Sequence, residues 1–403
     1  MRILHVVTAW PRDPEDVITP WLVTLAEKQA ERGHDVDVLA PAWHGQASEQ
    51  ARGVAVRRFR YAPARFERLT HEETVPDRLQ RHPGYAALVP GYLASGVTAA
   101  WRLGRRRGYD AVHVHWAVPH GLAGWAASRG ADAALVTTFY GAEIRWAEKR
   151  FPPARPFLRW YCRRSALVAI SESTRAMIAP YAGGRPIEVI PYGVPLPEEE
   201  PAGGGAHAEA EAEDSTATVP RILFVGRLVA RKGVDRLLEA LAEIAASPWR
   251  LEVVGFGPER GPLEARAEAL GISDRVDFLG RVTSEELVAA YRRAACFVLP
   301  ATLDERADTE GLGVVLLEAM SYRVPVVATR RGGIVDIVED GVTGVLVEDE
   351  PPAIARAIAA LLSDPARRRA LGEAGRARVR ERFGWDSIVD RLEAVYRSAA
   401  ERA

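Results

Sequence analysis

Two glutamates eight residues apart, Glu310 and Glu318, are the residues of this chain best suited to chemistry. They flank a mostly apolar stretch that we predict to be a buried helix over residues 313–322. Because eight residues nearly close two helical turns, both carboxylates would lie on roughly one face. Carboxylates accept hydrogen bonds from hydroxyls, so the pair suits a polyhydroxylated ligand such as a sugar or a ribose. The alternative is a capping acid followed by a solvated glutamate on the surface.

Two glycines next to Glu310 add a second kind of binding group. Gly311 and Gly313 leave backbone N–H groups unobstructed at the predicted helix N-terminus. An anion or a group of hydroxyls can be held there by hydrogen bonds and by the helix dipole.

A pair of cations follows the first predicted strand of the second half. Gly226 ends that strand, and Arg227 and Lys232 stand five residues apart in the loop that leads into a helix. Such a loop suits a diphosphate, because both cations can form charge-assisted hydrogen bonds with its oxygens. The chain has 50 arginines and three lysines, so a lysine here departs from its strong arginine bias. The alternative is two solvated loop cations.

A third loop resembles an interrupted dinucleotide fingerprint. Gly255-Phe256-Gly257-Pro258 follows a predicted strand, but Arg260 occupies the position of the last glycine. By itself the loop indicates only a tight turn from strand to helix.

The first half places polar side chains where strands end. His113, His115 and His120 cluster in the sequence, and His113 and His115 would share one face of a strand. A metal pair is conceivable, but no suitably placed acid or thiolate accompanies the histidines, so we expect no metal and favour a ligand site at the strand end. Tyr140 and Glu143 follow another strand, and the alternative there is a loop tyrosine and a capping acid.

Strands alternate with helices throughout both halves, which predicts two doubly wound, Rossmann-like α/β domains that face each other. In the first half we expect one helix over Pro20–Arg32 and strands at Ile3–Val7, Val36–Ala40, Ala111–His115, Leu135–Phe139, Leu167–Ile170 and Glu188–Ile190. In the second half we expect strands at Arg221–Val225, Leu251–Val254, Val276–Leu279, Cys296–Leu299, Val324–Ala328 and Gly344–Val347. Helices are expected between them, at about 235–246, 260–270, 284–293, 313–322, 334–339 and 351–363.

The domain boundaries follow from composition. Residues 198–219 are rich in glycine and glutamate and cannot bury apolar area, so they are predicted to be a flexible acidic linker. The linker separates an N-terminal domain, 1–197, from a C-terminal domain, 220–383. The final segment, 384–403, is predicted to form an amphipathic helix that returns to the N-terminal domain.

Bulk properties narrow the class of protein. The chain of 403 residues is 48% hydrophobic, enough for two cores, and it has no apolar run long enough to span a membrane. Two cysteines are too few for a disulfide framework or a thiolate metal site. We therefore expect a cytoplasmic protein.

The net charge of −1 hides an asymmetry. Residues 1–197 hold 26 Lys+Arg against 18 Asp+Glu. This basic half could make peripheral contact with the inner face of the membrane, through 101–107 and 155–164, or it could be a solvated face of an arginine-rich protein. No recognisable nucleic-acid-binding motif is present, so no nucleic-acid partner is expected.

Taken together, the motifs of the second half resemble family 4 glycosyltransferases of the GT-B fold, in which two Rossmann-like domains face a central cleft. The resemblance covers nearly the whole chain except the linker. It rests on the two glutamates, on the cationic and glycine-rich loops, and on Val276-x-Phe278-Leu279-Gly280, Pro325-Val326-Val327-Ala328-Thr329, Gly332-Gly333, Asp340-Gly341-x-x-Gly344, Ile190-Pro191-Tyr192-Gly193-Val194 and Arg32-Gly33-His34-Asp35-Val36.

The resemblance implies a retaining transfer of a sugar from a UDP- or GDP-linked donor to the hydroxyl of a sugar or lipid-linked acceptor. It implies no obligatory metal or cofactor, and a role in polysaccharide, glycolipid or glycoconjugate synthesis. In the donor site, Arg227 and Lys232 would hold the diphosphate, Glu310 would bind the sugar next to the reacting carbon, and Glu318 would bind the ribose. Further donor contacts would come from Gly255, Val282, Gly311, Leu312, Gly313 and Val314, and acceptor contacts from Trp10, His120, Tyr140 and Glu143.

Three positions depart from the family pattern. Tyr140 and Glu143 stand where many members have the histidine and aspartate of a His-Gly-x-Asp segment, which puts any histidine-specific role in doubt. The first loop lacks the frequent Gly-Gly pair, and Val335-Asp336 replaces the usual Pro-Glu. Two alternatives stay open from the sequence alone: a sugar-nucleotide epimerase of the same architecture and a non-catalytic nucleotide-sugar-binding protein.

Overall fold

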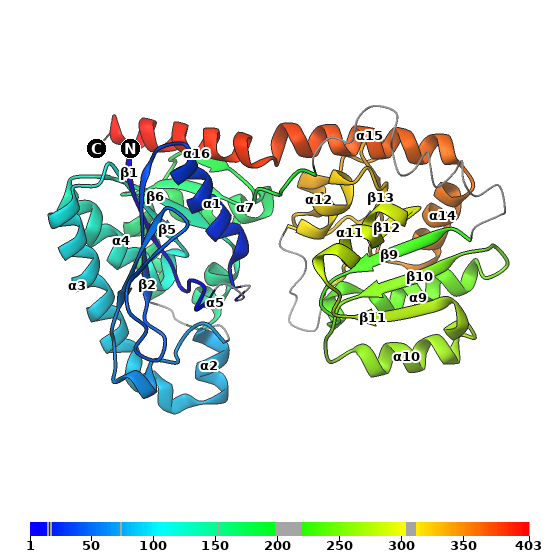
Figure 1. Cartoon of the computed structure of the whole chain (residues 1–403), viewed down its shortest axis with the longest axis horizontal. Coiled ribbons are helices and arrows are strands. Elements are labelled where there is room, and N and C mark those ends of the chain that lie inside the picture. Colours follow the sequence, from blue (N-terminus) through cyan, green and yellow to red (C-terminus); the bar gives the residue numbers. More distant parts are fainter. Residues whose placement is uncertain are drawn as a thin grey trace. The chain divides into compact units, whose positions relative to one another are not determined.

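The structure is a computed structural model that describes residues 1–402 except 14–15, 17, 73–74, 151–152, 198–218 and 304–311. Glu310, Gly311 and all of the predicted linker except Val219 therefore lie outside the described residues. The chain divides into two compact units (Figure 1). Unit 1 comprises Met1–Gly193 and Trp385–Ala403, and unit 2 comprises Val194–Gly384.

Unit 1 is built on an eight-stranded sheet of order β3-β4-β2-β1-β5-β6-β7-β8. All neighbouring strands pair in parallel except β3 and β4, which are antiparallel. The strands are β1 (Arg2–Val6), β2 (Asp35–Pro41), β3 (Glu49–Ala51), β4 (Val54–Phe59), β5 (Ala111–His115), β6 (Ala134–Phe139), β7 (Ala166–Ala169) and β8 (Ile187–Val189).

Unit 2 is built on a six-stranded parallel sheet of order β11-β10-β9-β12-β13-β14. Its strands are β9 (Arg221–Val225), β10 (Arg250–Val254), β11 (Val276–Gly280), β12 (Cys296–Leu299), β13 (Val326–Thr329) and β14 (Val345–Val347). The prediction of two parallel, Rossmann-like α/β domains is confirmed.

Helices connect the strands in both units. In unit 1 they are α1 (Pro20–Glu31), α2 (Val75–Arg81), α3 (Val89–Arg107), α4 (Ala117–Ala131), α5 (Ala142–Arg150), α6 (Ala154–Cys162), α7 (Glu172–Ala182) and α16 (Trp385–Ala400). In unit 2 they are α9 (Val234–Glu243), α10 (Arg260–Ala269), α11 (Ser284–Arg293), α12 (Val314–Ser321), α13 (Ile334–Ile337), α14 (Pro351–Leu362) and α15 (Pro365–Arg382).

The structure corrects some predicted elements. The sequence analysis missed β3 and β4, where two exposed polar residues, Glu49 and Gln50, and the pair Arg57-Arg58 weaken the apolar pattern of a strand. The predicted strand Val324–Ala328 is shifted to Val326–Thr329. Pro325 precedes the observed strand, as expected for a residue that has no N–H to donate to a sheet.

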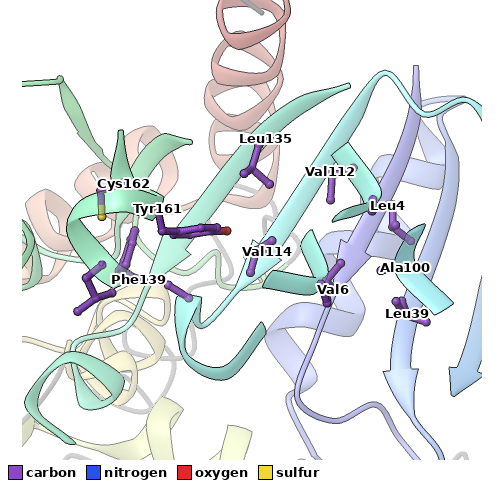
Figure 2. Packing of buried hydrophobic residues seen from close by; sticks show 14 of the residues in the cluster. Leu4, Val6, Leu39, Ala100, Val112, Val114, Leu135, Phe139, Tyr161 and Cys162 are labelled. Atoms are coloured by element: carbon purple, nitrogen blue, oxygen red, sulfur yellow. The ribbon is translucent and has the colours of Figure 1, made fainter. Parts of the chain in front are cut away.

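Apolar side chains cover both faces of the unit 1 sheet. One core cluster lies between the strands and helices α3, α4, α6 and α7, and Figure 2 shows members such as Val112, Val114 and Leu135 on neighbouring strands. The other cluster joins the opposite face to α1 and α16. The last helix thus packs on unit 1. A Cβ atom added at Gly193 would lie 2.4 Å from the ring of Trp385, so this ring is seated on glycine backbone.

Candidate functional site

The polar loops of unit 2 meet at one edge of its sheet. Strands β9, β10 and β12 are parallel neighbours, so their carboxyl ends lie on the same side. Gly226 and Arg227 directly follow β9, and Gly255 follows β10. This edge is where open α/β sheets bind ligands.

Gly255 brings two of these loops into backbone contact. Its φ is +136°, and a Cβ atom at this position would lie only 1.9 Å from the carbonyl oxygen of Gly226. The N–H of Gly226 also donates to the carbonyl of Val254 over 2.9 Å. Any side chain would clash with this carbonyl oxygen, so the backbone contact alone requires glycine at position 255, independently of any ligand.

The two cations of the β9 loop differ in environment. Lys232 ends a short 3-10 turn, Ala230–Lys232, and is only 8% exposed. Its Cε atom lies 3.7 Å from the position where a Cβ of Gly226 would be, so the lysine side chain runs beside the strand-end glycine. Arg227 is exposed at the loop surface.

An exposed aromatic ring, that of Phe256, lies where the loops after β10 and β11 meet. The N–H of Gly255 donates to the carbonyl of Gly280 over 2.8 Å, which ties the β10 loop to the end of β11. The guanidinium of Arg281 lies 3.9 Å from the ring centroid of Phe256, which is 47% exposed. Val282, half-buried, follows directly. The sequence analysis did not single out Phe256, because it stands at a position of the glycine motif for which no residue type is specified.

Helix α12 begins without a side-chain cap. Gly313 is its N-cap in the left-handed conformation, with φ +84°, and no side chain accepts from the first turn. Val314 is the first helical residue, and Leu312 is buried at 2% exposure. The backbone N–H groups at this end are therefore not used by a capping side chain, as an anion or hydroxyl site requires.

Glu318 lies on α12 and is half-buried, and its carboxylate bonds within the protein, unlike a solvated surface acid. One carboxylate oxygen, Oε2, accepts from the hydroxyl of Tyr291 over 2.8 Å. The Tyr291 ring stacks on Tyr322 with centroids 5.5 Å apart. Burial raises the pKa of Glu318, and the Tyr291 hydrogen bond partly opposes this shift.

In unit 1, Tyr140 and Glu143 follow β6 as predicted. The N–H of Tyr140 donates to Oε1 of Glu143 over 2.9 Å. The second oxygen, Oε2, is buried and has no hydrogen-bond partner among the described residues. Burial raises the pKa of this carboxyl to about 7, and backbone hydrogen bonds oppose the rise.

Tyr140 belongs to a cluster of four aromatic rings. It stacks on Trp116, with centroids 4.5 Å apart, and on Tyr192 at 5.8 Å. Trp21 contacts all three of these rings over 4.9 to 5.8 Å. The cluster joins residues from α1, the β5 and β6 ends and the segment after β8, and the Tyr140 ring is buried within it.

A buried hydrogen-bonded relay leads away from that hydroxyl. Tyr140 bonds Nδ1 of His115 over 2.7 Å, His115 bonds His5 over 3.0 Å, and His5 bonds Gln29 over 2.7 Å. Gln29 donates to the hydroxyl of Tyr396 on α16 over 3.1 Å.

A second branch leaves from Tyr396. Its hydroxyl bonds Nδ1 of His113 over 2.7 Å, and Nε2 of His113 bonds Thr138 over 2.8 Å. Burial lowers the pKa of His5 to about 4, and it lowers the pKa values of His113 and His115 well below the ordinary histidine value. The relay therefore consists of neutral histidines.

The same three histidines form a group that could hold a metal ion, with their ligand atoms within 4.8 Å of one another. Every ring nitrogen of His5, His113 and His115 is already engaged by a partner in the relay. A metal would have to break these bonds, so the geometry fits a hydrogen-bonded network better. The sequence analysis missed His5, because its partners lie 24 and 110 residues away.

Two other predicted acceptor residues are also buried. His120 is 3% exposed and its Nε2 bonds the hydroxyl of Thr8 over 3.1 Å. Trp10 is 3% exposed and packs in the core cluster that includes residues of α1. A cavity of about 420 Å³ lies between β7, β8 and α16, and none of the predicted site residues lines it.

No helix among the described residues is long and apolar enough to cross a bilayer.

Comparison with known proteins agrees with this geometry. Residues 21–197 match the model described as "Glycosyltransferase Family 4", and residues 208–378 match "Glycosyl transferases group 1". The chain is 32% identical over 370 residues to a GDP-mannose-dependent alpha-(1-6)-phosphatidylinositol monomannoside mannosyltransferase of Mycolicibacterium smegmatis, covering 90% of each chain. It is 32% identical over 409 residues to a D-inositol 3-phosphate glycosyltransferase of Geodermatophilus obscurus, covering 94% of this chain and 84% of the relative.

Solved structures show the same fold. Sucrose-phosphate synthase of Thermosynechococcus elongatus aligns with a TM-score of 0.73 at 23% identity, over 100% of both chains. Anabaena Alr3699/HepE in complex with UDP aligns with a TM-score of 0.70 at 22% identity, over 99% of this chain and 100% of that one. These matches support neither an epimerase nor a non-catalytic binding protein. The chain belongs to glycosyltransferase family 4, the GT-B enzymes that transfer a sugar from a nucleotide-diphosphate sugar with retention and without an obligatory cofactor.

Proposed function

We propose that this transferase uses GDP-mannose as donor and a hydroxyl of an inositol-phosphate-bearing molecule, free or lipid-linked, as acceptor. The observation that carries the proposal is the match over 90% of the chain to the GDP-mannose-dependent mannosyltransferase of phosphatidylinositol monomannoside. The second group of relatives, which act on D-inositol 3-phosphate, supports the same acceptor chemistry.

We propose that the diphosphate binds at the β9 loop. Lys232 is nearly buried next to Gly226, and the exposed Arg227 precedes it on the same loop. Two cations at this edge can offset the charge that grows on the leaving diphosphate as the sugar–oxygen bond breaks. The bare N-terminus of α12, with Gly313 and Val314, offers further N–H donors. Gly311 and Leu312 complete the proposed donor loop.

Glu318 is the proposed ribose ligand. Its Oε2 is held by Tyr291, which fixes the carboxylate, while Oε1 can accept from ribose hydroxyls. Glu310 is proposed to bind the transferred sugar next to the reacting carbon. Val282 is proposed to contact the base, with Phe256 offering an exposed ring beside it and Gly255 keeping the two loops close.

On the acceptor side, the proposal rests on Tyr140 and Glu143. The Tyr140 hydroxyl is fixed by His115, and one carboxylate oxygen of the buried Glu143 has no partner in the part of the chain that the structure describes. Such an oxygen can accept a hydrogen bond from a hydroxyl group of the acceptor substrate. We propose that His120 holds the loop after β1 in place on the acceptor side through its hydrogen bond with Thr8. We propose that Trp10 anchors the same loop by packing in the core cluster.

We also propose that residues 198–219, of which only Val219 is described, connect the domains 1–197 and 220–383. The proposed place of work is the cytoplasmic face of the membrane, where a lipid-linked acceptor would be presented.

Thermal shift with a panel of GDP- and UDP-sugars tests the donor. A ligand at 100 times its Kd stabilises the folded protein by about 2.7 kcal/mol, so the preferred donor should raise the melting temperature most. GDP-mannose should give the largest shift. A larger shift with any UDP-sugar would overturn the choice of donor.

Transfer assays then test the acceptor. With GDP-mannose, a mannosylated product should form from inositol phosphate, from a phosphatidylinositol mannoside, or from both, and the relative rates identify the source. Lack of product with both acceptors, from protein that binds GDP-mannose, would overturn the choice of acceptor.

A further inference from the structure

An aspartate outside the predicted site residues joins several loops at the edge of the unit 2 sheet where the proposed donor site lies. Strands β9, β12, β13 and β14 are parallel neighbours, so their carboxyl ends lie on one side of the sheet, and Figure 1 shows β9, β12 and β13 next to one another. Thr302 follows β12, Arg331 follows β13 and Asp349 follows β14, each by two or three residues. Arg231 lies in the loop after β9. The sequence analysis singled out none of these four residues.

Both carboxylate oxygens of Asp349 bind neighbouring loops. Oδ2 accepts from the hydroxyl of Thr302 and Oδ1 accepts from Nη2 of Arg331, each over 2.9 Å. Burial raises the pKa of this carboxyl, but the hydrogen bonds from Arg331 and Thr302 outweigh burial and hold the pKa below its ordinary value. The side chain is therefore ionised at neutral pH, and both oxygens act as acceptors at the same time.

The backbone of Asp349 is held as well. Its carbonyl oxygen accepts from Nη1 of Arg236 over 2.7 Å. Arg236 lies in the first turn of α9, the helix that begins two residues after Lys232. The main chain and the side chain of Asp349 are thus bound by three different segments, those of β12, β13 and α9. The carboxylate therefore has a defined position from which it holds Thr302.

Thr302 transmits this constraint to the loop of Lys232. The N–H of Thr302 donates to the carbonyl of Arg231 over 2.9 Å, which fixes the residue directly before the lysine. Gly233, directly after the lysine, packs on the same β12 loop, because a Cβ atom added there would lie 1.9 Å from the carbonyl oxygen of Pro300. The β12 loop therefore contacts the chain immediately before and immediately after Lys232.

We propose that Asp349 is a positioning residue of the donor site, which holds Thr302 and, through Thr302, the backbone that presents Lys232 to the diphosphate. The inference rests on the proposed role of Lys232. A cation offsets the charge of a diphosphate through direct hydrogen bonds, so its effect falls when the backbone that carries it shifts. Without the Asp349 carboxylate, the hydroxyl of Thr302 and the guanidinium of Arg331 would lose the acceptor that joins their two loops.

A double-mutant cycle tests this coupling, with the Kd of a nucleoside diphosphate measured by calorimetry on the full chain. GDP and UDP are both titrated, and the one that the wild type binds more tightly is used, so the result does not depend on the choice of base. K232M and D349A should each raise the Kd about 10-fold, since hydrogen bonds to charged groups contribute at least this much. The double variant should bind little more weakly than either single variant, because D349A acts through the lysine, whereas two independent losses would multiply to about 100-fold.

Two milder substitutions keep the test decisive if D349A fails to fold, which circular dichroism would show. T302V removes only the hydroxyl and keeps the N–H bond to Arg231, so it should raise the Kd by a smaller factor than D349A. D349N keeps the shape of the side chain, and its amide can accept from Arg331 and donate to the Thr302 hydroxyl. It should therefore restore most of the affinity that D349A loses.

Asp340 provides a matched control. It pairs with Arg330, the neighbour of Arg331 in the sequence, and its Oδ1 accepts from the N–H of Leu346 over 2.9 Å. D340A therefore removes one carboxylate, one arginine ion pair and one further hydrogen bond from the same region of unit 2. It should bind the nucleotide like the wild type, because these partners belong to the β13 and β14 segments and not to the β12 loop.

Several results would overturn the inference while leaving Lys232 on the diphosphate. These are an unchanged Kd in D349A, a double variant in which the two losses multiply, D349N binding as weakly as D349A, and a loss in D340A equal to that in D349A. An unchanged Kd in K232M would instead overturn the proposed role of Lys232 together with the inference.

Discussion

Replacing His5 should make unit 1 less sensitive to acid. His5 is fully buried in the relay, with a pKa lowered to about 4 from 6.5 by burial. The unfolded chain therefore binds a proton more readily than the folded one, so the stability linked to His5 is present above pH 6.5 and is lost as pH falls below it. Between pH 8 and pH 5.5 this loss is about 1.4 kcal/mol for one histidine, since the folded form stays neutral over that range.

The other buried histidines act in the same direction. Burial lowers the pKa of His71 to about 4 and that of His120 to about 3, and it lowers the pKa values of His113 and His115 well below the ordinary histidine value. Glu143 acts in the opposite direction, because burial raises its pKa to about 7 and its protonated form is favoured in the folded protein.

The assay is urea unfolding at pH 8 and pH 5.5, followed by tryptophan fluorescence. Nine of the ten tryptophans belong to unit 1, so the signal reports mainly on that unit. H5Q lowers stability at both pH values, but its loss on acidification should be smaller than that of the wild type by about 1.4 kcal/mol. H82Q, which replaces an exposed histidine, should keep the wild-type dependence. An acid loss in H5Q equal to that of the wild type would refute the reasoning.

Four further variants test other parts of the account. E318Q should raise the Kd for GDP about 10- to 100-fold in calorimetry, because hydrogen bonds to a charged group are worth about 1.5–3 kcal/mol; an unchanged Kd would remove Glu318 from the donor site. K232M should lower kcat/KM at least about 10-fold, with the fold intact by circular dichroism, while conservation of activity would exclude a role on the diphosphate. G255A should destabilise unit 2 by at least about 2 kcal/mol, since its Cβ would lie 1.9 Å from a carbonyl oxygen, and a melting curve like that of the wild type would contradict this contact. Y396F should cost about 1–3 kcal/mol in unfolding, because His113 and Gln29 lose their shared partner; no loss would argue against the relay.

Local patterns were enough to predict the strands of both sheets except β3 and β4, and the connecting helices α1, α9, α10, α11, α12, α13 and α14. They were also enough to indicate that Glu318 lies on a mostly buried helix, because its neighbours in the sequence are apolar. The relay could not be predicted in this way. Gln29 and Tyr396 are 367 residues apart, and their contact depends on the last helix returning to unit 1. The sequence likewise gave no sign that Phe256 would stay exposed beneath Arg281, because that depends on how the β10 and β11 loops meet.

The strands missed in unit 1 have a similar explanation. β3 pairs with β4 at the edge of the sheet, where polar residues such as Glu49 and Gln50 are exposed to solvent and leave no alternation to detect. The sequence also suggested that Trp10 is a contact residue, whereas the structure places it in the core. Its position in a loop after β1 carries no information about which way the ring points.

The central claim is a retaining transfer from a nucleotide-diphosphate sugar, and the anomeric configuration of the product tests it most directly. GDP-mannose labelled with ¹³C at the anomeric carbon would be supplied together with an inositol-phosphate acceptor, and the one-bond C–H coupling of the product measured by NMR. The product should be an α-mannoside, which keeps the configuration of the donor. A β-mannoside, or release of mannose with no acceptor product, would contradict it.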